Sequence, residues 1–280
     1  MKILLFGGQG RLGTAIQNKL TQHQYVYPTS QEVNITDKEA VTNYIQKQPV
    51  NIIINLAAYN NVDAAEKDST LADAINTQAP GYIAEATTEK NIPFVHFSTD
   101  YVFEGTKKEG YVESDQPNPI NAYGKSKWLG EKKVLEKNLQ AFIIRTSRLY
   151  GPPAKSPNAK RSFVDIVLDL ASKESSFTIN ESEVSAPTLV DDIALHLQKY
   201  FLDSLPEPGI YHMSNQGGCT WFEWAKEIVD ILNLPVQILP RDQNQQPRPA
   251  KRPLFSILHS TKITPMRPWQ EALKNYLLHP

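Results

Sequence analysis

Short apolar runs alternate with amphipathic stretches along the first half of the chain. Runs of strand length lie at residues 2–6, 25–27, 51–58, 92–97 and 141–145. Between them, apolar residues recur with the spacing of a helix face, at residues 11–20, 38–46, 60–67, 76–90 and 123–138. Strands that alternate with helices are typical of a parallel sheet covered on both faces. The pattern predicts an α/β fold with a doubly wound parallel sheet of the Rossmann type.

Beyond residue 150 this alternation loosens. Two proline-rich stretches, 205–209 and 235–253, separate helices that we expect at residues 162–172, 190–201 and 220–232. We interpret this part as a smaller α/β substrate lobe that closes over the carboxyl edge of the sheet. The predicted dinucleotide-binding domain comprises residues 1–145 plus about 188–213, and the predicted substrate-binding lobe comprises about 146–187 plus 214–280.

A glycine turn follows the first strand. Gly7, Gly10 and Gly13 form a G-x-x-G-x-x-G pattern that also contains Arg11 and Leu12. Without side chains, the backbone N–H groups of such a turn can approach a pyrophosphate at the amino end of the next helix. Because a strand precedes the turn and a helix follows it, the motif has the context that it requires. It predicts a dinucleotide cofactor.

The strand at residues 25–27 bears on the choice of cofactor. No acidic residue stands at its end, where an NAD enzyme places one for the ribose hydroxyl. Thr29, Ser30 and Arg11 are available for a 2′-phosphate instead, which favours NADPH over NADH. The competing interpretation, an ordinary loop and a surface arginine, stays open.

Two further segments are candidates for cofactor contact. Asn34 and Ile35 begin a segment, residues 34–37, that is placed to contact the edge of the adenine, although Thr36 or Asp37 is also an ordinary helix N-cap. Ala57 and Ala58 end the third strand, and small side chains at a strand's carboxyl end leave room for a ligand.

Tyr123 and Lys127 are the candidate proton-handling pair. They lie four residues apart on a predicted helix, so their side chains share one face. A nearby cation stabilises a phenolate, so we expect Lys127 to lower the pKa of Tyr123 from its usual value of about 10. Because this spacing is also common on solvated helix faces, it is weak evidence alone. Thr99, at the end of the fourth strand, is placed to hold a carbonyl oxygen beside Tyr123, whereas His96 within that strand is predicted to be a core residue.

The charge and the cysteine content indicate which class of ligand the protein binds and in which compartment we expect it. The 280 residues carry a net charge of −1 without clustering, which argues against a nucleic-acid or basic membrane-binding surface and for a small metabolite. Cys219 is the only cysteine, and the sequence offers no metal-ligand cluster. No apolar run near the start is long enough for a signal peptide or a membrane span. We expect a cytoplasmic protein.

Together these motifs resemble those of the extended short-chain dehydrogenase/reductase family, over nearly the whole length and in order. The match is narrower for the branch that reduces nucleotide-linked sugars, through residues 57–59, 62–66, 98–103, 123–131, 145–151, 186–188 and 252–256. The resemblance implies reduction by NADPH or NADH of the C4 ketone of a nucleotide-linked 4-keto-6-deoxy sugar, in deoxysugar and cell-surface polysaccharide biosynthesis.

The resemblance also assigns roles to individual residues. It makes Tyr123 the proton donor, Lys127 the group that binds the nicotinamide ribose and tunes Tyr123, and Thr99 the group that polarises the ketone. Ala57, Ala58 and Tyr59 would contact the cofactor. The residues that the resemblance places along the sugar site are Val62, Asp100 and Tyr101. Apart from the resemblance, Arg252 belongs to a basic cluster with Arg248 and Lys251 that suits a diphosphate, although a solvated proline-rich loop fits the pattern equally well. Arg148 is a further candidate for contact with the substrate.

Four departures from the family pattern bear on the substrate. Arg148 stands where the pattern has a tryptophan and Ser162 where it has an asparagine. Asn60-Asn61 replaces Thr-Ala, and Leu258-His259 replaces Leu-Asp. A cation in place of an aromatic wall loses stacking area and favours a more anionic or differently shaped sugar.

Two other functions stay open. The same fold supports epimerisation or dehydration of a nucleotide sugar, with the cofactor recycled in place. A non-catalytic subunit is the second alternative, because the family resembles the regulatory subunit of methionine adenosyltransferase, but the presence of Thr99, Tyr123 and Lys127 argues against it. The resemblance leaves a homodimer open.

Overall fold

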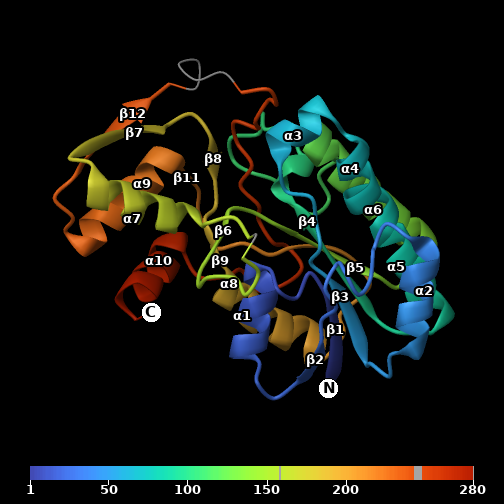
Figure 1. Ribbon diagram of the computed structural model, residues 1–280. Helices are drawn as coiled ribbons and strands as arrows, with labels where there is room; N and C mark the ends of the chain where they lie inside the picture. Colours follow the sequence, from blue (N-terminus) through green and yellow to red (C-terminus); the bar gives the residue numbers. More distant parts are fainter. Residues whose placement is uncertain (158, 243–247, 280) are drawn as a thin grey trace.

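A six-stranded parallel sheet forms the centre of the molecule. The computed structural model describes residues 1–157, 159–242 and 248–279 (Figure 1). Within them the strand order is β10-β5-β4-β3-β1-β2, and every neighbouring pair is parallel. The strands are β1 (Lys2–Phe6), β2 (Gln24–Val26), β3 (Ile52–Asn55), β4 (Phe94–Thr99), β5 (Phe142–Thr146) and β10 (Gly209–His212). The predicted doubly wound α/β fold is confirmed.

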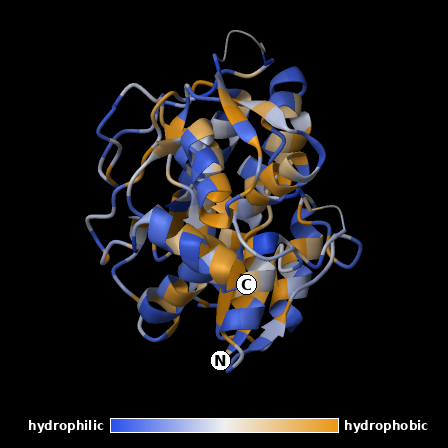
Figure 2. Cartoon of the chain, turned by 90° about the vertical axis from the view of Figure 1, so that its left-hand side faces the viewer, coloured by the Kyte–Doolittle hydropathy of each residue, from blue (hydrophilic) through white to orange (hydrophobic). Residues whose placement is uncertain are grey.

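Helices cover both faces of this sheet. Apolar residues of α1 (Arg11–Lys19) and α8 (Val190–Leu197) pack on one face, and a π-helical turn, η3 (Gln198–Leu202), continues α8. Residues of α2 (Lys38–Lys47), α5 (Ala79–Glu89) and α6 (Ala122–Lys137) pack on the other. Figure 2 shows the strands largely in hydrophobic colours and the helices in both, as expected for amphipathic helices around a buried sheet.

The helical region before α5 is less regular than the sequence predicts. After α3 (Val62–Lys67) a short turn, α4 (Thr70–Ala72), runs into a π-helical segment, η1 (Asp73–Gln78), which leads directly into α5. The helix expected at residues 76–90 therefore begins earlier. π-helical turns are rare and often mark functional sites, and this one packs against α6.

The second half of the chain adds a smaller α/β lobe, seen at the left of Figure 1. Its core lies among α7 (Phe163–Lys173), α9 (Trp221–Leu232) and α10 (Trp269–Leu278). Three strand pairs complete it: β7 (Ser176–Asn180) with β12 (Gln237–Arg241), β8 (Val184–Ser185) with β11 (Cys219–Thr220), and β6 (Leu149–Tyr150) with β9 (Thr188–Leu189). The sequence did not predict β12 or α10, and the predicted domain boundaries stay a prediction.

Ring stacking and hydrogen bonds anchor the loop after β4. The Tyr111 ring stacks on Phe103 with 4.1 Å between ring centres, and the Tyr111 hydroxyl accepts hydrogen bonds from three backbone amides of residues 105–107. The buried Glu113 carboxylate accepts from the amide and hydroxyl of Thr261. These contacts fasten the loop to the end of the substrate lobe.

A buried ion pair joins α6 to the sheet. The Glu131 carboxylate on α6 accepts from Arg145 Nε at 3.0 Å and from Arg145 Nη2 at 2.7 Å, and both side chains are at most 2% exposed. The Ser98 hydroxyl on β4 donates to the same carboxylate. One buried carboxylate thus ties together α6, β4 and β5. Arg145 also lies over the Phe103 ring, 5.1 Å from its centre.

Replacing Glu131 by Gln should destabilise the protein by about 3–5 kcal/mol, because the buried Arg145 cation loses its counter-charge. Chemical denaturation measures this change. Glu136→Gln is the matched control, since Glu136 lies exposed on the same helix and should change stability by less than about 0.5 kcal/mol. Equal effects of the two substitutions would contradict the role of the ion pair.

Candidate active site

The glycine turn lies where β1 and β3 end side by side. Gly7 has a φ of +78°, and a Cβ there would stand 2.7 Å from the backbone nitrogen of Ala57. Gly10 N donates to Gly7 O at 3.0 Å and closes the turn, after which α1 begins at Arg11. Only glycine at position 7 allows this backbone conformation and this close approach. The residues present therefore fit a dinucleotide's pyrophosphate.

The strand order places a crevice at this point. From β1 the chain moves outward to β2 and then returns to the other side of β1, where β3 lies. Open parallel sheets bind ligands outside the carboxyl ends of their strands at such a reversal. Gly7 and Ala57 flank this position, and Thr99 ends the next strand, β4. The glycine turn, which is predicted to bind the cofactor, and Thr99, which is predicted to be catalytic, thus lie at the same edge of the sheet.

Thr99, Tyr123 and Lys127 converge between β4 and α6. The Thr99 side chain lies close enough to the Tyr123 phenol to oppose the rise in its pKa, and Tyr123 is 9% exposed. One helical turn later the buried Lys127 Nζ donates to the carbonyl of Phe97 on β4 at 2.7 Å. Thr99 Oγ1 also donates to Asp100 Oδ1 at 3.0 Å. The sequence-predicted catalytic residues therefore meet in space.

The pKa of Tyr123 corrects one expectation. Burial raises it to about 12, and only the neighbouring Thr99 side chain opposes that rise. Lys127 was expected to lower it, but its ammonium is turned to the Phe97 carbonyl and does not act on the phenol in this structure. Burial lowers the pKa of Lys127 itself to about 8, against the opposing effect of Glu131. At neutral pH the phenol is therefore protonated.

Two glycines let α6 approach its neighbours closely. A Cβ on Gly124 would collide with the carbonyl oxygen of Tyr101, which belongs to the 3-10 turn η2 (Asp100–Val102) after β4. A Cβ on Gly130 would collide with the carbonyl oxygen of Asn76 in η1. Because backbone meets backbone at both points, α6 holds a fixed position against the strand that carries Thr99.

Two asparagines hold the segment after β3 against α6. Asn76 accepts from the amide of Tyr59 at 2.8 Å and donates to the Tyr59 carbonyl and to Ser126 Oγ, both at 3.0 Å. The Tyr123 hydroxyl donates to Asn60 Oδ1 at 3.4 Å. The sequence marked Asn60 only as a departure from the family pattern and did not single out Asn76. A polar residue at a buried helical position was the available signal for Asn76.

The predicted sugar-site residues lie around Tyr123. Val62 and Tyr101 pack in one apolar cluster with Tyr123, and the Tyr101 and Tyr123 rings meet edge to face at 5.8 Å. Tyr59, which was predicted to contact the cofactor, packs in the same cluster. The buried Asp100 carboxylate accepts from Ser185 at 3.0 Å and Ser256 at 2.6 Å. These bonds tie η2 to the substrate lobe. Burial raises the pKa of Asp100 although these hydrogen bonds oppose it.

Arg148 is bonded within the substrate lobe, whereas Arg252 joins that lobe to α3. Arg148, at a φ of +40°, donates to the carbonyls of Cys219 and Glu183 at 2.7 and 2.8 Å and lies 4.1 Å from the centre of the Trp221 ring. Arg252 pairs with Asp63 at 2.8 Å across the two lobes. Their predicted contacts with substrate stay predictions.

The remaining predicted cofactor residues occupy different positions. The Arg11 guanidinium donates to the carbonyls of Gly151 and Pro152 at 2.5 and 2.8 Å. Leu12 is buried against the sheet. Asn34 accepts from the amide and hydroxyl of Thr36, and Ile35 packs beside the core under α2. Their cofactor contacts stay predictions.

Comparison with known proteins identifies the family. The RmlD substrate binding domain family matches residues 1–279. This chain belongs to that family. A curated relative, the spore coat polysaccharide biosynthesis protein SpsK of Bacillus subtilis, is 35% identical, over 99% of this chain and 96% of its own. A dTDP-4-dehydrorhamnose reductase of Mycolicibacterium smegmatis is 31% identical, over 98% of this chain and 84% of its own.

Solved structures of the family share the whole architecture. The dTDP-4-dehydrorhamnose reductase of Bacillus anthracis, solved in complex with NADP, superposes with a TM-score of 0.91 at 33% identity and covers 99% of this chain and 98% of its own. The UDP-glucose 4-epimerase of Thermus thermophilus superposes at 0.78 with 20% identity, over 100% of this chain and 98% of its own, and shows a shared fold. The resemblance seen in the sequence is confirmed for this member of the RmlD family.

Two further observations concern the part of the chain that the structure describes. None of its helices has the length and apolar character that crossing a bilayer requires. Within the same residues, no three His, Cys, Asp or Glu side chains are grouped as they would be around a metal ion.

Lys127→Met should stabilise this RmlD family member by about 1–2 kcal/mol at pH 7, because it removes a buried charge at the cost of one hydrogen bond. The folded pKa of Lys127, about 8, lies below the ordinary 10.5. Between these two pH values the unfolded chain binds more protons at Lys127 than the folded protein does. The free energy of unfolding of the wild type therefore rises with pH, and the stability difference between the Met variant and the wild type disappears. Urea denaturation across this pH range measures it.

Lys125→Met is the matched control, since Lys125 lies exposed on the same helix. It should show no such pH dependence. A Lys127→Met variant less stable than wild type at pH 7, or a difference independent of pH, would show that the ammonium is not penalised by burial.

Proposed function

We propose that this protein is an NADPH-dependent reductase of the C4 ketone of a nucleotide-linked 4-keto-6-deoxy sugar, acting as a dTDP-4-dehydrorhamnose reductase in deoxysugar biosynthesis. The observation that carries the proposal is the convergence of Thr99, Tyr123 and Lys127 at the same edge of the sheet as the glycine turn. Relatives of that name at 31% and 33% identity support it, as does the NADP complex of the Bacillus anthracis enzyme.

Each of the three side chains has a role in this reaction. A bound nicotinamide cofactor would supply the hydride. The Tyr123 phenol donates a proton to the carbonyl oxygen, and the Thr99 hydroxyl holds that oxygen by a hydrogen bond. With a pKa raised to about 12, Tyr123 carries its proton at neutral pH, which is the state that a proton donor needs.

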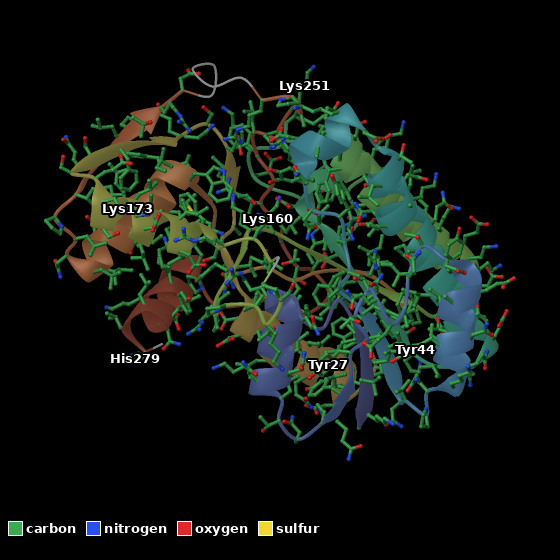
Figure 3. All side chains as sticks on the ribbon, in the orientation of Figure 1. Tyr27, Tyr44, Lys160, Lys173, Lys251 and His279 are labelled. Atoms are coloured by element: carbon green, nitrogen blue, oxygen red, sulfur yellow. The ribbon has the colours of Figure 1, made fainter. Side chains whose placement is uncertain are left out.

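The hydroxyl of the proposed proton donor, Tyr123, is already bound to an acceptor side chain in this structure. Tyr123 donates to Asn60, whose carbonyl accepts from Lys160 at 3.1 Å. Figure 3 shows Lys160 near the centre of the view, between the sheet and the substrate lobe. A bound ketone oxygen takes over from Asn60 as the acceptor of the Tyr123 proton. We propose Lys127, freed from Phe97, as the group that binds the nicotinamide ribose.

The substrate, a small-molecule nucleotide sugar, binds next to the apolar cluster of Tyr59, Val62 and Tyr101. Arg252 and Arg148 supply positive charge near its diphosphate. The single cysteine, Cys219, is buried and free, which fits the reducing cytoplasm where sugar nucleotides are made. A homodimer stays a prediction.

Reduction should consume cofactor in step with product. With enzyme, NADPH and dTDP-4-keto-6-deoxy sugar, we expect continuous loss of nicotinamide absorbance, one cofactor for each sugar reduced. An epimerase or dehydratase would form product without net loss of NADPH. Product formation without NADPH loss, observed by chromatography of the sugar nucleotide, would contradict reduction and support epimerisation or dehydration instead.

Tyr123→Phe should lower kcat by about 100- to 10,000-fold, because one proton-donating hydroxyl is removed while the pocket keeps its shape. Affinity for NADPH, measured by fluorescence titration, should change by less than about threefold. Tyr44→Phe is the control, since Tyr44 lies on α2 away from the site, as labelled in Figure 3. Full turnover by Tyr123→Phe would remove Tyr123 from the mechanism.

A further inference from the structure

A loop from the substrate lobe crosses the glycine turn. We call residues 151–157 and 159–161 the strap loop. Ser156 N donates to Gln9 O at 2.9 Å, and Lys155 N donates to Thr14 Oγ1 at 3.1 Å. Arg11 fastens the start of the loop through two backbone carbonyls. The strap loop, which lies next to the start of α1 in Figure 1, therefore has a defined position over the predicted pyrophosphate site.

The Lys155 ammonium is held at one end of this turn. Its Nζ donates to Gln17 Oε1 at 2.8 Å and lies 5.3 Å from the centre of the Tyr27 ring. Gln17 is itself oriented, because its Nε2 donates to Gly8 O at 2.6 Å and Gly13 O at 2.9 Å. The Gln17 amide thus bonds to the glycine turn through its nitrogen and presents its oxygen to Lys155.

Tyr27 stands where dinucleotide-binding folds place the residue that contacts the adenosine ribose. It follows β2 directly and stands 20 positions after Gly7, where dinucleotide enzymes that use NAD carry an acid for the 2′-hydroxyl. A Cβ on Gly8 would collide with the Tyr27 side chain, so this ring lies against the glycine turn. In this protein the Tyr27 ring, with the Lys155 ammonium near its face, stands in the position of that acidic residue.

Neighbouring polar groups are already engaged. The Thr29 amide and hydroxyl both donate to Glu32, at 2.7 and 2.9 Å. Arg11 donates to the strap loop and to Asp165. An ammonium next to the ribose attracts a phosphate dianion, whereas the Glu32 carboxylate would favour a free ribose diol. Lys155 and Glu32 therefore predict opposite cofactor preferences.

We propose that Lys155, delivered by the strap loop, binds the 2′-phosphate of NADPH and so determines the preference for NADPH over NADH. The proposal rests on the proposed function in that it assigns a site for the cofactor of that reaction. Gln17 is a positioning residue that holds the Lys155 ammonium beside Tyr27.

Adenosine 2′,5′-bisphosphate and 5′-AMP test the proposal without any sugar or turnover, because they differ only in the 2′-phosphate. By titration calorimetry, the wild-type protein should bind the bisphosphate more tightly. Lys155→Gln should weaken bisphosphate binding by about 10- to 100-fold and 5′-AMP binding by less than about twofold. Lys155→Arg should restore most of the bisphosphate affinity. Lys173→Gln, an exposed lysine on α7 shown in Figure 3, should change neither.

Three results would overturn the proposal. Equal weakening of both ligands by Lys155→Gln would show that the strap loop only closes the turn. Unchanged bisphosphate binding would show that Lys155 does not touch the phosphate. Tighter binding of 5′-AMP than of the bisphosphate by the wild type would assign the ribose to Glu32. Because no ketosugar is present, loss of the proposed reductase activity and loss of this site are observed separately.

Discussion

The buried contact between α6 and the sheet is the constraint on which the site depends. Glu131 binds Arg145 and Ser98 inside the molecule, and the glycines at positions 124 and 130 bring the α6 backbone against η2 and η1. A helix fixed at its middle and at its start cannot slide or rotate freely. The side chains of Tyr123 and Lys127 therefore face β4 at a set distance, and Thr99 meets them there.

This arrangement buries a charged side chain and a polar side chain, and burying them lowers the stability of the fold. Lys127 is 2% exposed with a single backbone acceptor, and Tyr123 holds its proton more tightly than a free tyrosine does. Burying such groups with few polar partners costs stability. Function, rather than stability, explains why a lysine occupies this position.

The sequence predicted what local patterns determine. The glycine turn, the strand before it and the helix after it are neighbours in sequence, and Tyr123 and Lys127 lie on one helix, so both could be found without coordinates. The partners of Asn60, Arg148 and Arg11 could not, because each lies more than 30 residues away and is brought close only by the tertiary fold. The lowered pKa expected for Tyr123 failed for the same reason, since burial and the Phe97 carbonyl are properties of the fold.

The most direct test of the account is a crystal structure with NADP and the nucleotide-linked sugar bound. The account predicts that the Tyr123 hydroxyl leaves Asn60 and that Tyr123 Oη and Thr99 Oγ1 both lie within about 3.2 Å of the sugar's C4 oxygen. A sugar whose C4 oxygen lies away from both hydroxyls, with Tyr123 still bonded to Asn60, would contradict it.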